Sequence, residues 1–316
     1  MKPKRIMAVI TATAVIAAIS IGLMPDKFVN LPVFTSNAAD IVASGECGVD
    51  GDNVVWQLDS EGTLTISGEG DMADEPNFRQ YSDDVLNVNI ENGITTIGYS
   101  SFAFFNNLTS VTLPNSLTSI ASLSFRACSS LTSIIIPNSV TDIGYAAFRG
   151  CSNLTSITIP ENVKKIGQDT FGYCQNLLSI DISNGVTSIE EGAFSGCSSL
   201  TSIIIPNSVK NIGAGAFSSC VKLHTVTIGE GVTDICGSSF GNTPWLDNKI
   251  AENPLVIING ILISGRAYEG DLIIPDSVKT IASEAFSGAD KLTSITIPES
   301  VTSIKNSAFQ FCSNLI

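Results

Sequence analysis

The chain has 316 residues, of which 44% are hydrophobic and 15% charged, and its formal net charge is -14. Only 16 Lys and Arg residues stand against 30 Asp and Glu residues, whereas a surface that binds nucleic acid needs clustered basic side chains. The composition therefore argues against a nucleic-acid partner, and the acidity otherwise favours solubility.

Residues 1–38 have the pattern of a secretion signal. The chain begins with the basic stretch Met1-Lys2-Pro3-Lys4-Arg5, and residues 6–24 carry no charge and are largely apolar. Small residues at positions 36–38 fit a cleavage site, so a signal peptide is predicted over residues 1–38. The alternative is a retained membrane anchor, because about 20 apolar residues can span a bilayer. Either way, the remaining chain is expected at the cell surface or in the secreted fraction, with the membrane as a partner only through an uncleaved signal.

Residues 39–84 are predicted to form an N-terminal cap. Two runs of alternating residues flank Asp59-Ser60-Glu61-Gly62, which is the pattern of a β-hairpin. Its expected role is to cover the first coil of the repeats that follow, since the ends of stacked repeats need a polar cap. Asp50-Gly51-Asp52-Asn53 fits a turn better than a Ca²⁺ loop, because it lacks the spaced ligands and the terminal Glu of an EF-hand.

One phenylalanine recurs at a fixed spacing through residues 85–316. Each such Phe at position i is followed by another at i+23, except that the interval between Phe240 and Phe286 is doubled. A constant period indicates backbone coils of equal length, which is typical of a solenoid. The ladder positions are Phe102, Phe125, Phe148, Phe171, Phe194, Phe217, Phe240, Phe286 and Phe309.

The apolar residues between ladder positions predict two apolar sides for each coil. Ile157 and Ile159 alternate as in a strand with one buried face, and Pro160 ends this strand. Val140 and Ile143 form a second apolar pair, which faces the first across the core. The pattern therefore predicts a mainly β repeat solenoid of about ten coils, with a parallel sheet and a core stack of Phe rings.

Five of the eight cysteines lie on consecutive coils in one column, at the third position after a ladder Phe. Neighbouring coils are about 4.8 Å apart, so disulfide bridges after export are possible by distance. Thr243 and Ala289 occupy the same column in other coils, which indicates that a small or apolar side chain suffices there. A buried, reduced column is expected, with a bridged column as the alternative. The five residues are Cys128, Cys151, Cys174, Cys197 and Cys220.

The repeat pattern weakens between Phe240 and Phe286. Residues 241–274 are predicted to be degenerate coils that keep the register, with Ile263 in the Phe column. Two short apolar runs around Asn259-Gly260 predict a pair of strands joined by a tight turn. The first interpretation is that these are degenerate coils. The alternative is a recognition feature, because the residues exposed here differ from those of the other coils. The candidate specificity residues are Trp245, Asn259, Arg266 and Tyr268.

Two motifs match catalytic patterns by letter but lack the context that their chemistry needs. Residues 237–241 fit G-x-S-x-G around Ser239, but the sole histidine, His224, lies upstream of it. Residues 68–73 fit a dinucleotide loop, but Glu69 and Asp71 would repel a pyrophosphate. There is no C-x-x-C pair or Cys/His cluster for a metal. The sequence therefore predicts no catalytic residue, no cofactor and no metal site.

The outward positions of the predicted strands form a repeated, hydroxyl-rich face. At strand spacing, ten coils give a flat surface of about 50 Å along the stack. Such a surface suits extended contact with a protein, although it lacks the aromatic and Arg anchors of strong interfaces, so each coil should contribute weakly. The candidate partner-binding residues are Ser133, Ile135, Ser156, Thr158, Ser179, Asp181, Ser202, Ile204, Thr225 and Thr227.

The repeat resembles the short leucine-rich repeats of the BspA-like family of bacterial surface proteins. The family pattern A-F-x-x-C-x-x-L-x-x-I-x-I-P-x-x-V-x-x-I is met from Ala147 to Ile166, and the resemblance covers about residues 85–316. Residues 44–48 and 56–68 also resemble the leader found in this family. The resemblance implies a curved or slightly twisted leucine-rich-repeat solenoid at the surface of a bacterium or secreted by it.

The resemblance and the repeated face together predict an exported, non-enzymatic module that adheres to proteins of a host or a neighbouring cell. One alternative is a structural spacer for a further C-terminal anchoring or docking module, since the chain stops in mid-repeat at Ile316. The other is a carbohydrate-binding surface protein. Sugar rings stack on exposed aromatic side chains, and most Phe residues here are expected in the core, which disfavours a glycan partner.

Overall fold

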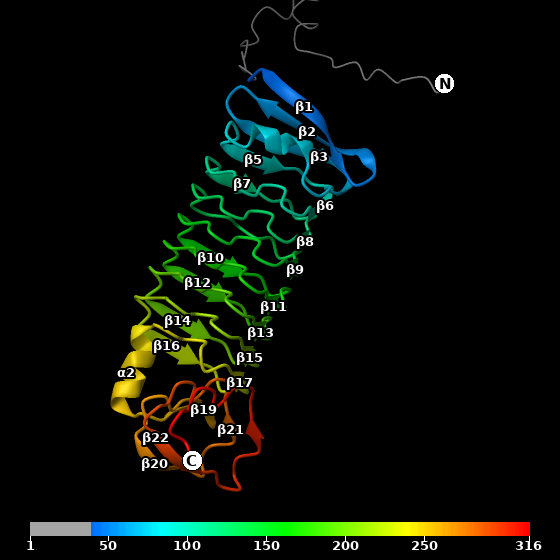
Figure 1. Cartoon of the computed structure of the whole chain (residues 1–316). Coiled ribbons are helices and arrows are strands. Elements are labelled where there is room, and N and C mark those ends of the chain that lie inside the picture. Colours follow the sequence, from blue (N-terminus) through cyan, green and yellow to red (C-terminus); the bar gives the residue numbers. More distant parts are fainter. Residues whose placement is uncertain (1–38) are drawn as a thin grey trace, which may run out of the picture. The chain divides into compact units, whose positions relative to one another are not determined.

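A computed structural model of the chain describes residues 39–316, and the predicted signal peptide lies outside this range. From Asp40 onward the chain forms one unit, a mainly β solenoid of about 11 turns (Figure 1). Within the described residues, the only helices are the 3₁₀ helix η1 (Asn77–Tyr81) and the α-helix α2 (Pro244–Glu252). The predicted fold class is confirmed. None of the helices in this part of the chain has the length and apolar character of a membrane span.

The N-terminal cap contains the predicted hairpin and one strand more. β2 (Gly51–Asp59) and β3 (Thr63–Gly68) pair antiparallel around the predicted turn, and β1 (Ile41–Gly48) pairs with the outer edge of β2. β3 also pairs in parallel with β5 (Asn87–Ile90), so the cap continues directly into the stack of coils. Trp56 fills the cap, where its Nε1 donates a hydrogen bond to Asn77 Oδ1 at 2.7 Å.

Each coil contributes backbone to two sides of the solenoid. Alternating β-branched residues on the longer strands bury one row of Ile side chains and expose the other row. On this first side the strands after β5 are β7 (Ser110–Thr112), β10 (Ser156–Ile159), β12 (Ser179–Ile182), β14 (Ser202–Ile205), β16 (Thr225–Ile228), β20 (Gly270–Ile273) and β22 (Leu292–Thr296).

The second side is built from short strands that are parallel apart from one antiparallel hairpin, and it carries the second apolar pair. It is divided into three hydrogen-bonded sheets, because the ladder is not continuous between every pair of neighbouring coils. Its strands are β4 (Gly70–Asp71), β6 (Ile94–Ile97), β8 (Ser119–Ile120), β9 (Asp142–Ile143), β11 (Lys165–Ile166), β13 (Ser188–Ile189), β15 (Asn211–Ile212), β17 (Asp234–Ile235), β18 (Val256–Ile258), β19 (Ile261–Ser264), β21 (Thr280–Ile281) and β23 (Ser303–Ile304).

The Phe ladder forms the centre of the core, as predicted. From Phe102 to Phe240 the rings of neighbouring coils stack with centroids 5.1–5.5 Å apart. The ladder starts one coil earlier than the sequence suggested, because Phe78 of η1 stacks on Phe102 at 5.4 Å. Phe78 lies one position further from Phe102 than the regular period allows, so a search at the constant step misses it.

A tight turn surrounds each ladder Phe, and hydrogen bonds join it to the turn of the next coil. At Phe148 the bonds run from the amides of Ala146, Phe148 and Gly150 to the carbonyls of the following coil, at 2.8–3.0 Å. At every regularly spaced ladder Phe except Phe240, positions i−2 and i+2 both have left-handed backbone, as at Asp169 with φ of 56° and Tyr173 with φ of 60°. We call the stretch from i−3 to i+2 around each ladder Phe the Phe turn.

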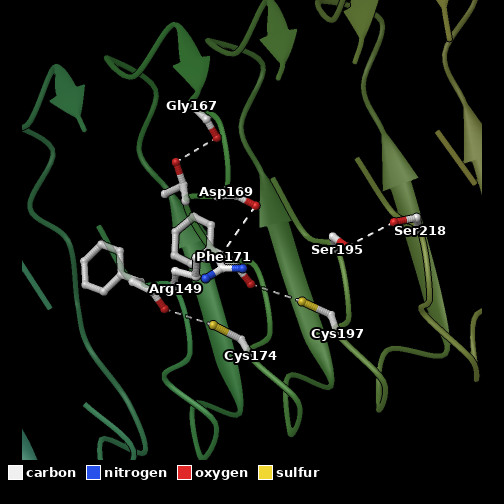
Figure 2. Close-up of polar contacts among 10 residues, drawn as sticks. Arg149, Gly167, Asp169, Phe171, Cys174, Ser195, Cys197 and Ser218 are labelled. Carbon is white, nitrogen blue, oxygen red and sulfur yellow. Dashed lines mark hydrogen bonds and ion pairs between the residues drawn. The ribbon is translucent and has the colours of Figure 1, made fainter. Parts of the chain in front are cut away.

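The cysteine column is buried, as predicted, and its thiols are free in this structure. Each Sγ donates a hydrogen bond to the carbonyl of the ladder Phe of the preceding coil, as from Cys174 to Phe148 and from Cys197 to Phe171, both at 3.3 Å (Figure 2). Burial raises the pKa of the Cys220 thiol to about 12 and raises the pKa values of Cys128, Cys174 and Cys197 well above the usual value. These thiols are therefore core side chains.

Residues 241–285, which we call the irregular segment, depart from the predicted register. Leu262 pairs with Ile281, so the Ile column passes from Ile235 to Leu262 and then to Ile281. The first of these steps is longer than the regular period and the second is shorter, although together they span two periods. The predicted register, with Ile263 in the Phe column, is therefore wrong: Gly265 donates its amide to the carbonyl of Ala285, as a ladder Phe does in a regular coil. The predicted strand pair around Asn259-Gly260 is confirmed as β18 and β19.

Helix α2 was not predicted. Pro244 stands at its first position, and the Thr243 side chain accepts a hydrogen bond from the Leu246 amide at 3.3 Å, which are ordinary signals for the start of a helix. The helix replaces a strand of the first side, and its Trp245 ring packs on Phe240 at 4.7 Å. The Phe ladder therefore ends at Trp245 and begins again only with Phe286 and Phe309, which stack at 5.1 Å.

Candidate interaction surfaces

The ten predicted residues of the repeated face, which we call the sheet face, are all exposed. On β10 and β12, Ser156 lies beside Ser179 and Thr158 beside Asp181 in parallel register. On β14 and β16, Ser202 lies beside Thr225 and Ile204 beside Thr227. Ser133 and Ile135 lie on a coil that forms no regular strand. The structure therefore brings these side chains into two adjacent columns.

The sheet face carries two prominent apolar side chains and a shallow depression. Ile135 is 85% exposed and Ile204 is 70% exposed, which is unusual for isoleucine in a folded chain. The depression, of about 290 Å³, lies where β12 and β14 belong to different hydrogen-bonded sheets, and Leu178, Asp181 and Ile204 contribute to its lining. A partner that covers Ile204 would therefore also reach this depression.

The four candidate specificity residues do not form one surface. Trp245 is only 6% exposed and belongs to the core, so it is not a contact residue. Asn259 has left-handed backbone, and its Nδ2 donates hydrogen bonds to the carbonyls of Gly229 and Val232, so it ties the turn to the preceding coil. Tyr268 is partly buried against the core. Arg266 is exposed and forms an ion pair with Asp247 of α2 at 3.4 Å.

The motifs that resembled catalytic sites have structural roles. Ser239 is buried, and its hydroxyl donates to the carbonyls of Ile212 and Gly213, so it is held as a turn residue and faces no histidine. His224 is exposed, and its Nδ1 lies 2.5 Å from the carbonyl of Lys222. Over residues 39–316 no group of three or more His, Cys, Asp or Glu side chains is arranged to hold a metal ion.

A second surface, which the sequence reasoning missed, lies on the Phe turns. Phe104 and Tyr173 are each nearly half exposed, and both stand at i+2 from a ladder Phe. Arg126 and Arg149 stand at i+1 from a ladder Phe on the two coils between them. The signal was present in the columns next to the ladder, where every other coil up to Phe240 has Ala, Gly, Ser or Asn. These columns lie outside the predicted strands, so strand alternation does not point to them.

Comparison with protein families gives one match. The model of the BspA type leucine rich repeat region matches in six copies, over residues 76–198, 141–264 and 270–316. These ranges include the Phe turns, the sheet face and most of the irregular segment. A search among curated proteins found no match.

Comparison with solved structures gives the same fold. A leucine rich cell surface protein from Faecalibacterium prausnitzii is similar with 29% sequence identity and a TM-score of 0.51, over 83% of this chain and 73% of that one. A leucine-rich repeat protein from Bacteroides ovatus is similar with 20% identity and a TM-score of 0.56, over 84% and 80% of the two chains. The second similarity concerns the fold alone.

Proposed function

This chain belongs to the BspA-type leucine-rich-repeat family, and from that premise we propose that it is an exported, non-enzymatic module that binds another protein. Its place of action is the bacterial cell surface or the secreted fraction, with residues 1–38 as the signal for export. The cell-surface description of the similar protein from Faecalibacterium prausnitzii supports this location.

The exposure and register of the sheet face carry the proposal. Each coil from Ser133 to Thr227 presents two outward side chains, so a partner meets the same chemistry at every step along the stack. Most of these side chains are Ser or Thr hydroxyls, which donate and accept hydrogen bonds and lose little conformational entropy when a partner orders them. Binding then depends on many weak contacts made at once.

Ile135 and Ile204 are the strongest individual contacts that this face can offer. They lie three coils apart, about 15 Å at strand spacing, so one partner surface can cover both. Burial of one isoleucine side chain against a partner is worth roughly 1.5–3 kcal/mol, which is more than a solvent-competing hydroxyl contact provides. The two isoleucines therefore serve as the test positions.

The test uses the full chain and a matched control. The double variant Ile135→Glu/Ile204→Glu places charges on the sheet face, whereas Thr141→Glu/Asn211→Glu places the same charges at exposed positions near β9 and on β15 of the second side. Both variants and the wild type are immobilised and offered surface proteins from host and neighbouring cells. We expect a protein that binds the wild type and the control variant but not the sheet-face variant. Equal capture by all three chains would contradict the proposal.

Two further assays separate the alternatives. Binding on a glycan array that is lost in the sheet-face variant, without a protein partner, would favour a carbohydrate-binding function. A chain that reaches the cell surface and binds neither class would favour a spacer. Hydrolytic activity that disappears with Ser239→Ala would contradict the non-enzymatic assignment.

A further inference from the structure

The exposed aromatic side chains of the coils lie on the Phe turns and not on the sheet face. Each stands at i−3 or i+2 from a ladder Phe, where the backbone turns sharply. Isolated exposed aromatics are common, but four of these five lie within the four successive coils from Phe102 to Phe171, where they form a stripe over two columns of the Phe turns; the fifth, Phe311, lies in the last coil. They are Tyr99, Phe104, Tyr145, Tyr173 and Phe311, with exposures of 41–73%.

Two arginines are built into this stripe in a symmetrical way. The Arg126 guanidinium lies over the Phe104 ring, 5.2 Å from its centroid, and the Arg149 guanidinium lies over the Tyr173 ring at 4.7 Å. The order along the stack is therefore aromatic, Arg, Arg, aromatic on four successive coils. Ala127 and Gly150 lie between them, and together the six residues line a hollow of about 320 Å³. No acidic side chain lines it.

The arginines are held in place but lack partners for most of their N–H groups. The turn backbone beneath them is fixed, because the Phe104 amide donates to the Arg126 carbonyl and the Ala127 amide to the Arg149 carbonyl, both at 2.7 Å. Arg126 makes no side-chain hydrogen bond or ion pair within residues 39–316. Arg149 has only Asp169, whose Oδ1 lies 3.8 Å from its Nε, beyond hydrogen-bond distance (Figure 2).

Two like charges on adjacent coils repel each other, and the Asp169 carboxylate beside Arg149 offsets part of this repulsion. Stacking on an aromatic ring also offsets part of the repulsion and orders the guanidinium before any ligand arrives. A planar, ordered guanidinium with free N–H groups is suited to bidentate contact with a carboxylate. The arrangement is thus complementary to two carboxylates, in a chain whose net charge is otherwise -14.

We propose that Arg126 and Arg149 bind two carboxylates of an acidic, extended segment of a partner protein. In an extended strand, alternate side chains point to the same side about 7 Å apart, which the two arginines can span from coils about 5 Å apart. A sugar acid is less suited, because the guanidinium groups already cover a face of each ring on which a sugar would stack. This proposal goes beyond the proposed function because it adds a second binding surface. If the arginine site is disproved, the proposal for the sheet face is unaffected.

The test measures binding of a blocked Gly-Glu-Gly-Glu-Gly peptide to the full chain by calorimetry at low ionic strength. We expect Arg126→Ala and Arg149→Ala each to weaken binding by about tenfold, since a hydrogen bond to a charged group contributes about that factor. Arg149→Lys keeps the charge but loses the planar fork, so it should fall between wild type and Arg149→Ala. The control Arg266→Ala removes an exposed arginine elsewhere and should bind like the wild type.

The outcomes are separable. Peptide binding that falls with added salt, is lost with Gly-Gln-Gly-Gln-Gly and depends on both arginines supports the site. No binding of the glutamate peptide by wild type, or equal binding by the Arg126→Ala/Arg149→Ala variant, would overturn it. Tighter binding of oligogalacturonate than of the peptide would overturn the choice of a protein ligand. Thermal melting of each variant confirms that the stack is intact.

Discussion

The regular coils from Phe102 to Phe240 keep the same number of residues in every coil, whereas the irregular segment keeps only the total number of residues of two coils. In the regular coils every inward column repeats at the constant period, and each Phe ring rests on the next. In the irregular segment the total length is kept at two periods, but α2 and the β18–β19 hairpin divide it unequally. A segment of two periods therefore lets the stack continue beyond it. The buried side chains at fixed spacing are what give each regular coil the same shape.

The largest effect is expected from breaking the regular ladder. Phe171 is fully buried between Phe148 and Phe194, at ring distances of 5.3 and 5.5 Å. Phe171→Ala should cost about 3–5 kcal/mol in the free energy of unfolding, measured by urea denaturation, because it leaves a cavity within the stack. Val221→Ala, at a residue 56% exposed, is the control and should change little. Similar losses for the two variants would show that the ladder is not the core of the stack.

A smaller effect is expected where the irregular segment meets the second part of the ladder. A Cβ added to Gly265 would lie 2.1 Å from Cε1 of Phe286, so the ring occupies the space that a side chain would need. Gly265→Ala should cost about 1–3 kcal/mol in unfolding free energy, through overpacking. Gly150→Ala is the comparison in a regular coil, where the nearest atom lies at 3.6 Å; its φ of 78° adds backbone strain, but Ala127 adopts a φ of 59° at the same position one coil earlier. It should cost less, and the reverse order would contradict the packing described for Gly265.

The cysteine column should make the regular coils sensitive to alkaline pH. Below about pH 9 folded and unfolded thiols both keep their protons, so the stability that burial provides is fully present. Above this value the unfolded chain releases protons that the folded chain retains, because burial raises the pKa of Cys220 from 9.0 to about 12. Each buried thiol should then lower the unfolding free energy by about 1.4 kcal/mol per pH unit until its folded pKa is passed. Urea denaturation at several pH values between 9 and 12 gives the slope of the unfolding free energy against pH. This slope should be shallower for Cys220→Ala than for wild type, and equal slopes would contradict the prediction.

The smallest effect is expected for the ion pair of the irregular segment. Arg266 and Asp247 are both about half exposed, and surface pairs of this kind contribute roughly 0–1 kcal/mol. A double-mutant cycle with Arg266→Ala and Asp247→Ala should give a coupling free energy in that range. Asn259→Ala, which loses two hydrogen bonds to the preceding coil, should destabilise by more than this coupling. A coupling above about 2 kcal/mol would mean that α2 is held mainly by charge.

The sequence was sufficient for features that repeat and insufficient for features that occur once. The Phe, Cys and Ile columns predicted the fold because every copy of the ladder Phe reports the same environment. Helix α2 was not predicted because the repeat pattern predicts degenerate coils over these residues, although Thr243 and Pro244 are ordinary signals for the start of a helix. Trp245 was predicted as a specificity residue because it lies where the repeated surface becomes individual, yet its ring packs on Phe240 in the core.

The two candidate surfaces show the same division. The sheet face follows from strand alternation, so its ten residues could be named without coordinates. The arginine and aromatic pairs lie on four different coils at two different columns, and only the left-handed turns place them around one hollow. Their contact depends on a backbone geometry that the spacing of residues does not reveal.

Native-state hydrogen exchange on the full chain tests most directly whether the Phe ladder is broken between Phe240 and Phe286. Amides of the Phe turns donate to the next coil throughout the regular part, as Phe171 and Phe194 do at 2.8 Å, so they should exchange only through large, shared openings. Amides of α2 and the β18–β19 hairpin should open at a distinctly lower free energy, because Phe240 and Phe286 do not stack. A single exchange free energy from Phe194 through Phe286 would contradict the break in the ladder.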